Sequence, residues 1–217
     1  MNSKMEKSQE CIADGLWMPN NTEPFWQTRF NDKISREVCV VEITAEEYLY
    51  VEEAVENWWL NQKHGEWGEG LANNTEEGDG KKAQRIGLLG EVAFAKIFQV
   101  LVQVGYEFRG NDYDFDFLGE TWEMKTALCN REAGLVRVIS DTGVELPLSA
   151  DNYIFAYLVS EDKEQKCAKI ALVGTITKDL LQEQPIVPAR KGFHQNREAP
   201  YDLLTPIQDL WNMNNAS

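Results

Sequence analysis

The hydrophobic and polar positions of this chain follow two periods, one typical of strands and the other of helices. Thr44 and Glu47 form a capping-box signature, and apolar residues at helical spacing continue for about 18 residues after it. A second, more apolar helical pattern runs from about Lys82 to Val104. Strands are predicted where β-branched and aromatic residues cluster, at residues 37–43, 136–139, 144–148, 150–159 and 169–176.

Strands and helices therefore alternate, which predicts an α/β fold with a mixed central β-sheet flanked by helices. A chain of 217 residues suits one such domain, which we assign to residues 37–217. Residues 1–36 mix aromatic side chains with Asn, Thr and Pro, and we interpret them as an N-terminal arm that packs by its aromatics. Residues 64–80 are rich in Gly, Asn and Glu, which predicts a loop.

A shorter alternating stretch after the second helix predicts a β-hairpin that carries its chemistry on one face. Its aromatic residues and its aspartates fall on opposite faces, because strand side chains alternate. Crowded carboxylates are costly unless a cation neutralises them. Mg²⁺ prefers such oxygen ligands and can orient a water molecule against a phosphate. The acids of this face are Asp112, Asp114, Asp116 and Glu123, with Lys125 beside them.

The position of the turn decides which of these acids meet across the hairpin. Gly119 and Glu120 predict a two-residue turn with glycine at its first central position. That register places Asp116 opposite Glu123, since directly paired residues share a face. Hairpin geometry by itself therefore favours Asp116 as the partner of Glu123.

The same hairpin resembles the core motif of the PD-(D/E)XK nuclease superfamily. The resemblance rests on Asp114 within Tyr-Asp-Phe, on the nine-residue step to Glu123, and on Glu123-Met-Lys125 followed by Thr126. The Pro of the superfamily name is absent. The preceding helix, the following strands and a short helix also come in the order of that superfamily, so the resemblance covers about residues 82–182.

The resemblance implies a restriction-endonuclease-like core and a phosphodiesterase site that uses Mg²⁺, for which Mn²⁺ substitutes. It implies that Asp114 and Glu123 bind the metal, with the Met124 carbonyl as a further ligand, and it favours Asp114 over Asp116. Lys125 would position the attacking water or stabilise the phosphate. The implied substrate is nucleic acid, first of all DNA cut by an endonuclease, and an RNA substrate stays open.

Glu91 is the acid that the second predicted helix adds to the candidate site. It is set among apolar residues at helical spacing, so it points toward packed surface and needs a partner. The resemblance implies that Glu91 contributes to catalysis by binding a metal-bound water or a second ion. The structural alternative is a salt bridge to Lys125 or Arg85.

Two basic segments are candidate phosphate contacts, because cationic side chains position nucleic acids through their phosphates. One opens the second helix and the other lies in a loop near the C-terminus. The residues are Lys81, Lys82, Arg85, Arg190 and Lys191.

The formal charge of −15 is unusual for a nuclease. Residues 1–80 hold 17 acidic and 6 basic side chains, so most of the excess lies outside the predicted core. Strong nonspecific binding to duplex DNA is therefore not expected. The charge also supports an alternative function, a noncatalytic acidic interaction protein or nucleic-acid mimic on the same fold.

The remaining features narrow the class of protein. No apolar run is long enough for a membrane span, no signal-peptide pattern opens the sequence, and the four cysteines are scattered, so we expect a cytoplasmic protein without a membrane partner. A homodimer or a protein partner stays open. With two histidines and no Gly-x-Ser-x-Gly motif, a serine or cysteine hydrolase is disfavoured.

Overall fold

The computed structural model describes residues 16–27, 36–64, 77–103, 113–128, 133–140, 142–189 and 194–216. The helices are α2 (Ala45–His64), α4 (Glu77–Phe98), α5 (Lys178–Gln182) and α6 (Ile207–Ala216), with a 3-10 helix η2 (Tyr201–Leu203). The strands are β1 (Leu16–Trp17), β2 (Phe25–Gln27), β3 (Val38–Ile43), β4 (Val102–Gln103), β5 (Phe115–Phe117), β6 (Glu120–Leu128), β7 (Ala133–Ile139), β8 (Asn152–Asp162), β9 (Cys167–Thr177), β10 (Ile186–Pro188), β11 (Gln195–Pro200) and β12 (Thr205–Pro206).

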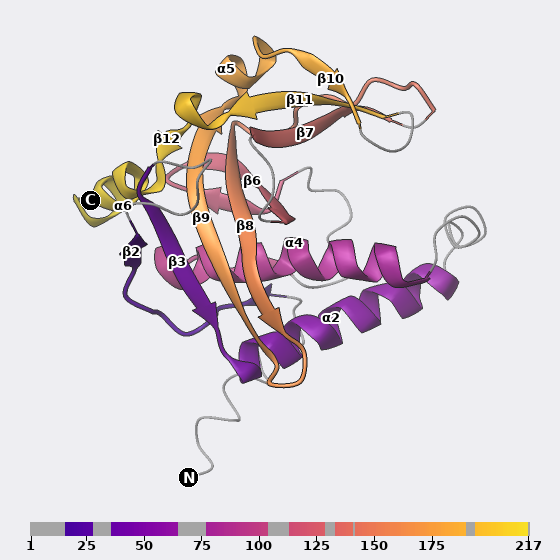
Figure 1. The fold of residues 1–217 in the computed structure, drawn as a ribbon, viewed down its shortest axis with the longest axis vertical. Helices are drawn as coiled ribbons and strands as arrows, with labels where there is room; N and C mark the ends of the chain where they lie inside the picture. The colour runs from indigo at the N-terminus through magenta and orange to yellow at the C-terminus, as the bar shows by residue number, and fades with distance from the viewer. Residues whose placement is uncertain are drawn as a thin grey trace.

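The centre of the molecule is a mixed sheet, as the alternation of strands and helices predicts. Its strand order is β2-β3-β9-β8-β6-β5, and β12 pairs with β9. Strands β6 and β8 run parallel, whereas the other pairs of described strands are antiparallel. The long β8–β9 hairpin forms the middle of this sheet (Figure 1).

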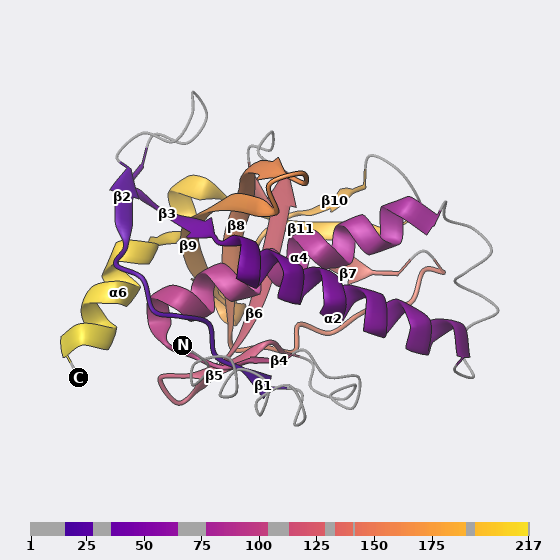
Figure 2. The ribbon, with the colours of Figure 1, turned by 90° about the horizontal axis from the view of Figure 1, so that it is seen from below.

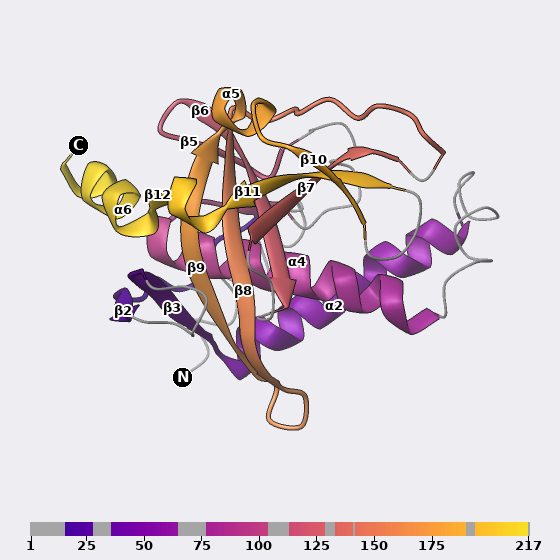
Figure 3. The same ribbon diagram turned by 45° about the horizontal axis from the view of Figure 1, so that its top comes forward.

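Two different layers cover the two faces of the central sheet. Helices α2 and α4 lie side by side against one face, and α6 packs at its end (Figures 1 and 2). On the other face, β10, β11 and β7 form a second sheet that crosses the central strands, with α5 beside it (Figure 3). Each face has its own buried apolar core, one under the helices and one under the second sheet.

Aromatic contacts fix helix α4 against the hairpin formed by β5 and β6. The rings of Phe94 and Phe98 stack with centroids 4.4 Å apart. Phe115 lies 5.0 Å from Phe94, and Phe117 lies 5.3 Å from Phe98. The aromatic face predicted for the hairpin therefore packs on α4, which holds the opposite, acidic side in a fixed position.

The predicted start of α2 is confirmed by its hydrogen bonds. Thr44 N–H donates to Glu47 Oε2 at 2.8 Å, and Glu47 N–H donates to Thr44 Oγ1 at 3.4 Å, which is a capping box. The same Glu47 oxygen accepts from Lys96 Nζ at 2.8 Å, and both side chains are buried. This ion pair ties the first turn of α2 to α4.

The second helix ends earlier than its apolar pattern predicts, so the predicted end at Val104 is wrong. Gln99 adopts a φ of 57°, a left-handed conformation that stops the helix after Phe98. The apolar residues that follow continue as β4, which pairs with β1. Val102 is buried there as a strand residue, because a partner strand replaces the helical turn.

Other boundaries also differ from those that the sequence predicts. The strand expected at residues 144–148 is reduced to an isolated bridge between Glu145 and Ile139. Helix α4 begins at Glu77, inside the loop expected at residues 64–80, of which residues 65–76 lie outside the described part. The short helix expected after Thr177 is confirmed, and Thr177 Oγ1 accepts the N–H of Leu180 at 3.4 Å.

The described part of the N-terminal segment packs on the domain. The ring of Trp17 lies 4.2 Å from that of Tyr50 on α2. Strand β2 adds to the edge of the central sheet through β3. Among the helices described, none combines the length and apolar character that a membrane crossing requires.

Candidate functional site

The hairpin that carries the acids has a different register from the predicted one. Leu118 and Gly119 are its central turn residues, with φ of 54° and 79°, which is the geometry of a type I′ turn. Asp116 therefore pairs with Thr121, so its predicted pairing with Glu123 is wrong. Glycine stands at the second central position rather than the first, and this shifts the register by two residues on the second strand.

The observed register brings Asp114 to the position across from Glu123. Asp114 N–H donates to the carbonyl of Trp122 at 2.9 Å, which continues the ladder one step beyond β5. Asp114 Oδ2 then accepts the N–H of Met124 at 2.6 Å. The Asp114 carboxylate thus takes the place of a backbone carbonyl as the acceptor at the end of the ladder, so Asp114 lies against β6.

Beyond this point β6 has one open edge among the described strands. Residues 122–128 pair with β8 on one side, whereas β5 covers the other side only as far as Trp122. The candidate site lies where β5 leaves β6, because Asp114, Glu123 and Lys125 all belong to that short region.

Glu123 and Lys125 point toward the face that carries the second sheet. Their neighbours Trp122 and Met124 are buried in the core under α4, so the alternate residues face the other way. Lys125 Nζ forms an ion pair with Glu123 Oε1. The two side chains keep 33% and 20% of their surface exposed, so both remain accessible from the solvent.

Glu91 reaches the same acids from helix α4. Burial raises its pKa well above the ordinary value, the charge of Asp114 raises it further, and Lys125 opposes the rise. Burial also raises the pKa of Asp114 to about 6; the Met124 N–H and Lys125 lower it, and Glu123 raises it. The four side chains therefore share one electrostatic environment with more negative charge than Lys125 neutralises.

Gly90 explains how α4 comes close enough to contribute Glu91. A Cβ atom at Gly90 would lie 1.8 Å from Oγ1 of Thr126 on β6, closer than two atoms can approach. Glycine therefore permits the contact between helix and strand at the residue next to Glu91. Gly87, one turn earlier, has nothing within 4 Å of such an atom.

Among the described residues, the predicted salt bridge from Glu91 to Lys125 or Arg85 is not formed, and each cation pairs with another carboxylate. Arg85 binds Glu161 through two nitrogens, at 2.8 and 3.2 Å, and Lys125 binds Glu123. Glu161, at the end of β8, and Lys163 repeat the Glu-x-Lys spacing of Glu123 and Lys125. Glu161 also accepts a hydrogen bond from Tyr48 at 2.8 Å, so it is part of the packing rather than a free surface acid.

The described acids of the candidate site lie near one another but are not close enough to form a complete metal site. Within the described ranges, no three side chains of His, Cys, Asp or Glu lie close enough together to hold one metal ion. Asp116 is exposed and accepts a hydrogen bond from Tyr113 at 3.4 Å, apart from the site. Asp112 lies outside the described residues.

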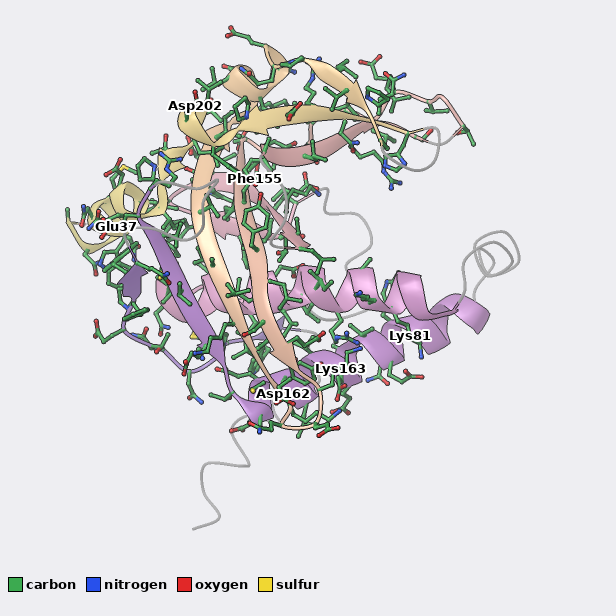
Figure 4. All side chains as sticks on the ribbon, viewed as in Figure 1. Glu37, Lys81, Phe155, Asp162, Lys163 and Asp202 are labelled. Carbon is green, nitrogen blue, oxygen red and sulfur yellow. The ribbon has the colours of Figure 1, made fainter. Side chains whose placement is uncertain are left out.

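Two of the candidate phosphate contacts form ion pairs with carboxylates of the protein. Lys81, labelled on α4 in Figure 4, binds Glu56 of α2 at 2.6 Å, and Arg85 binds Glu161. Lys82 is exposed. Arg190 and Lys191 lie outside the described residues.

A cavity of about 1130 Å³ opens beside Lys125, along the open edge of β6. One wall is α4 around Ile86 and Gly87, and the opposite wall is formed by β7, β10 and β11. The floor comes from β6 and from Phe155 on β8. The cavity therefore lies between α4 and the second sheet, and of the candidate site residues Lys125 lines it.

Comparison with known proteins identifies no relative. The chain matches no family model, no curated protein and no solved structure.

Sequence reasoning did not single out two residues that the fold brings to this region. Tyr153 of β8 is in register with Glu123, and burial together with the Glu123 charge raises its pKa to about 12. Arg137 of β7 lines the cavity that contains Lys125. Neither stands near the motif along the chain, so only strand pairing and the crossing of the second sheet reveal them.

Proposed function

We propose that this protein is a metal-dependent nuclease that hydrolyses phosphodiester bonds, and that it acts as a DNA endonuclease. The observation that carries the proposal is the grouping of Asp114, Glu123 and Lys125 where β5 leaves β6, with Glu91 beside them. These are the residues through which the chain resembles the PD-(D/E)XK superfamily. The mixed sheet with helices is compatible with a restriction-endonuclease-like core.

The donor set suits Mg²⁺, which commonly takes one or two carboxylates and completes its shell with water and phosphate oxygens. Asp114 and Glu123 would hold the ion. The charge balance supports this assignment, since Glu91 and Asp114 both have pKa values raised by burial and by neighbouring carboxylates. A cation in this position relieves that repulsion.

The protein groups around the ion would divide the remaining work. Glu91 would orient water on the helix side of the site. Lys125 would leave Glu123 for the substrate and stabilise the negative charge that develops on the phosphate, since a cation aimed at developing charge lowers the barrier. A nucleic-acid strand in the cavity would meet Lys125, which lines it.

Plasmid cleavage in Mg²⁺ or Mn²⁺ tests this function directly. Asp114→Ala and Lys125→Ala should each lower the cleavage rate by about 100-fold or more, the usual effect of losing one transition-state contact. Activity that survives both substitutions would remove the assignment. Adding an RNA of the same sequence to the assay decides between DNA and RNA as substrate.

The chain supplies matched controls for both substitutions. Asp116→Ala removes an exposed acid from the same hairpin, and Lys163→Ala removes the lysine of a second Glu-x-Lys match in the turn after β8. Both variants should cleave at the wild-type rate. A comparable loss in either control would show that the loss does not report on the proposed site.

The second candidate function, a noncatalytic acidic interaction protein, is favoured by the net charge of −15. Calorimetric titration with Mg²⁺ separates the two proposals. A nuclease should bind the metal, and Glu123→Gln should abolish that binding. An acidic mimic should show no binding that depends on Glu123.

A further inference from the structure

Arg137 is a cation that has no carboxylate partner among the described residues and that lines the cavity. Within the described part of the chain, six lysine and arginine side chains lie within 4.0 Å of a carboxylate. Arg137 is exposed and belongs to none of these pairs. An exposed guanidinium without a described carboxylate partner, in the same cavity as Lys125, is available to bind an anionic ligand.

The direction of Arg137 follows from the burial of its neighbours. Val136 and Val138 are buried in the core between the two sheets. Because strand side chains alternate, Arg137 lies on the other face of β7, which it shares with Asn196 and Glu198 and which lines the cavity. It lines the cavity on the wall across from α4, while Lys125 lines it from β6.

Asn196 of β11 stands next to Arg137 on this wall. The two residues are Cα partners in the antiparallel pairing of β11 with β7, and both line the cavity. Asn196 is almost fully buried, at 7% exposure, so its side chain is held in place. A planar guanidinium with an amide donor beside it is suited to binding phosphate oxygens.

Glu198, one step further along β11, also lines the cavity. Its register partner is Leu135, two residues from Arg137, so it lies diagonally across the strands from Arg137. A carboxylate on the same wall repels a phosphate. Among the described residues of this wall, Arg137 is the Lys or Arg side chain that can offset this repulsion.

We propose that Arg137, assisted by Asn196, binds a backbone phosphate of the nucleic-acid strand that enters the cavity, apart from the phosphate that is cleaved. The inference rests on the proposed nuclease function and adds a substrate contact from the second sheet. The strand would then lie between α4 and β7, held by Arg137 on one wall and presented to Lys125 at the edge of β6.

Cleavage kinetics and equilibrium binding of one fluorescein-labelled DNA test the proposal. Arg137→Ala should raise KM about tenfold with kcat little changed, because a charge-assisted contact made equally in ground and transition states is lost. The slope of log affinity against log salt concentration should fall by about 0.9, the value for one phosphate contact. Arg137→Lys should retain part of the affinity, and Glu198→Gln should increase it.

Lys163→Ala is the matched control. Lys163 lies in the turn that closes the β8–β9 hairpin, at the far end of β8 from Phe155, which lines the cavity (Figure 4). This variant should leave KM, kcat and the salt slope unchanged. Its melting temperature and that of Arg137→Ala should equal the wild-type value, because both side chains are exposed.

The outcomes separate the two proposals. If the wild type cleaves the DNA and Arg137→Ala leaves KM and the salt slope unchanged, or lowers kcat without raising KM, the role of Arg137 is overturned while the nuclease function stands. If the wild type binds without cleaving and Arg137→Ala loses that binding, the contact stands and the nuclease function fails. A wild type that neither binds nor cleaves overturns both.

Discussion

Carboxyl groups at the candidate site are buried close to one another, which disfavours their ionisation. Glu91 and Asp114 are carboxyls whose pKa values are raised by burial, and each lies in the field of another acid. Lys125 opposes both shifts, but one ammonium group serves several carboxylates. Such conflict costs folding stability, and proteins retain it where the charges serve a ligand or a reaction.

Replacing Glu91 by Gln should therefore stabilise the metal-free protein. The folded-state pKa of Glu91 lies above its unfolded value. Protonation of Glu91 therefore favours the folded state. This contribution to folding stability is fully present below about pH 4 and is lost as the pH rises through the folded-state pKa. The gain from Glu91→Gln should thus be near zero at pH 4 and on the order of 1 kcal/mol at pH 8. Urea unfolding at the two pH values measures this difference.

Asp116→Asn provides the control for that experiment, since Asp116 is an exposed acid on the same hairpin. It should change the free energy of unfolding little at either pH. A Glu91→Gln protein that is less stable than the wild type at pH 8 would contradict the electrostatic account of the site.

At the scale of elements, the β5–β6 hairpin and α4 together bring the acids to one place. The turn sets the register, and the register decides that Asp114 rather than Asp116 reaches Glu123. Helix α4 adds Glu91 because Gly90 allows it to touch β6. Both the turn and the helix contact depend on glycine. Gly119 permits the left-handed backbone of the turn, and Gly90 leaves room for Thr126.

The turn should respond to substitutions that match or oppose its left-handed backbone. Leu118 has a φ of 54°, so Leu118→Asn should raise the free energy of unfolding by about 0.5–1 kcal/mol. Gly119 has a φ of 79° and open space around it, so Gly119→Ala should lower it by about 1 kcal/mol through strain. Denaturant unfolding of both variants measures these changes. Equal effects of the two would contradict the type I′ turn.

The two glycines of α4 should give opposite results. Gly90→Ala forces a Cβ into Thr126 and should cost about 1–3 kcal/mol. Gly87→Ala meets no atom within 4 Å and should stabilise the helix by about 0.5–1 kcal/mol. Thermal unfolding of the pair checks the prediction. A stable Gly90→Ala variant would mean that α4 does not rest directly on β6.

At the scale of the whole molecule, the central sheet separates two unlike layers, and the candidate site lies at the edge between them. The helices supply Glu91, the central sheet supplies Glu123 and Lys125, and the second sheet supplies Arg137. The net charge of −15 makes the molecule as a whole repel nucleic acid. Under the proposed function, nucleic-acid binding would therefore depend on local cations and on bound metal.

Divalent metal should stabilise the whole fold if Asp114 and Glu123 bind it. Ligand that binds only the folded state raises its stability, by about 2.7 kcal/mol at a concentration 100 times the Kd. Mg²⁺ should therefore raise the melting temperature of the wild type in a concentration-dependent way. The variants Asp114→Asn and Glu123→Gln should show no such rise, whereas Asp116→Asn should behave like the wild type. A rise of equal size in all four proteins would indicate nonspecific charge screening.

Local signals in the sequence were sufficient for most elements. The capping box of α2, the apolar runs of β8 and β9 and the Thr177 cap of α5 are each confirmed by the structure. They succeed because each depends on residues a few positions apart. Helix α4 was predicted, but its end was not, since a left-handed Gln99 and pairing with β1 override an apolar pattern that fits either element.

Some features of the candidate site likewise follow from local sequence, whereas others depend on tertiary structure. The sequence by itself determined which acids and which lysine belong to the hairpin, and that its aromatic face would be buried, because alternation along a strand is a local property. Only the tertiary structure decided between Asp114 and Asp116, since the turn type fixes the register. It also brought Glu91, Tyr153 and Arg137 to the site, because strand pairing and layer packing join segments that are far apart in the chain.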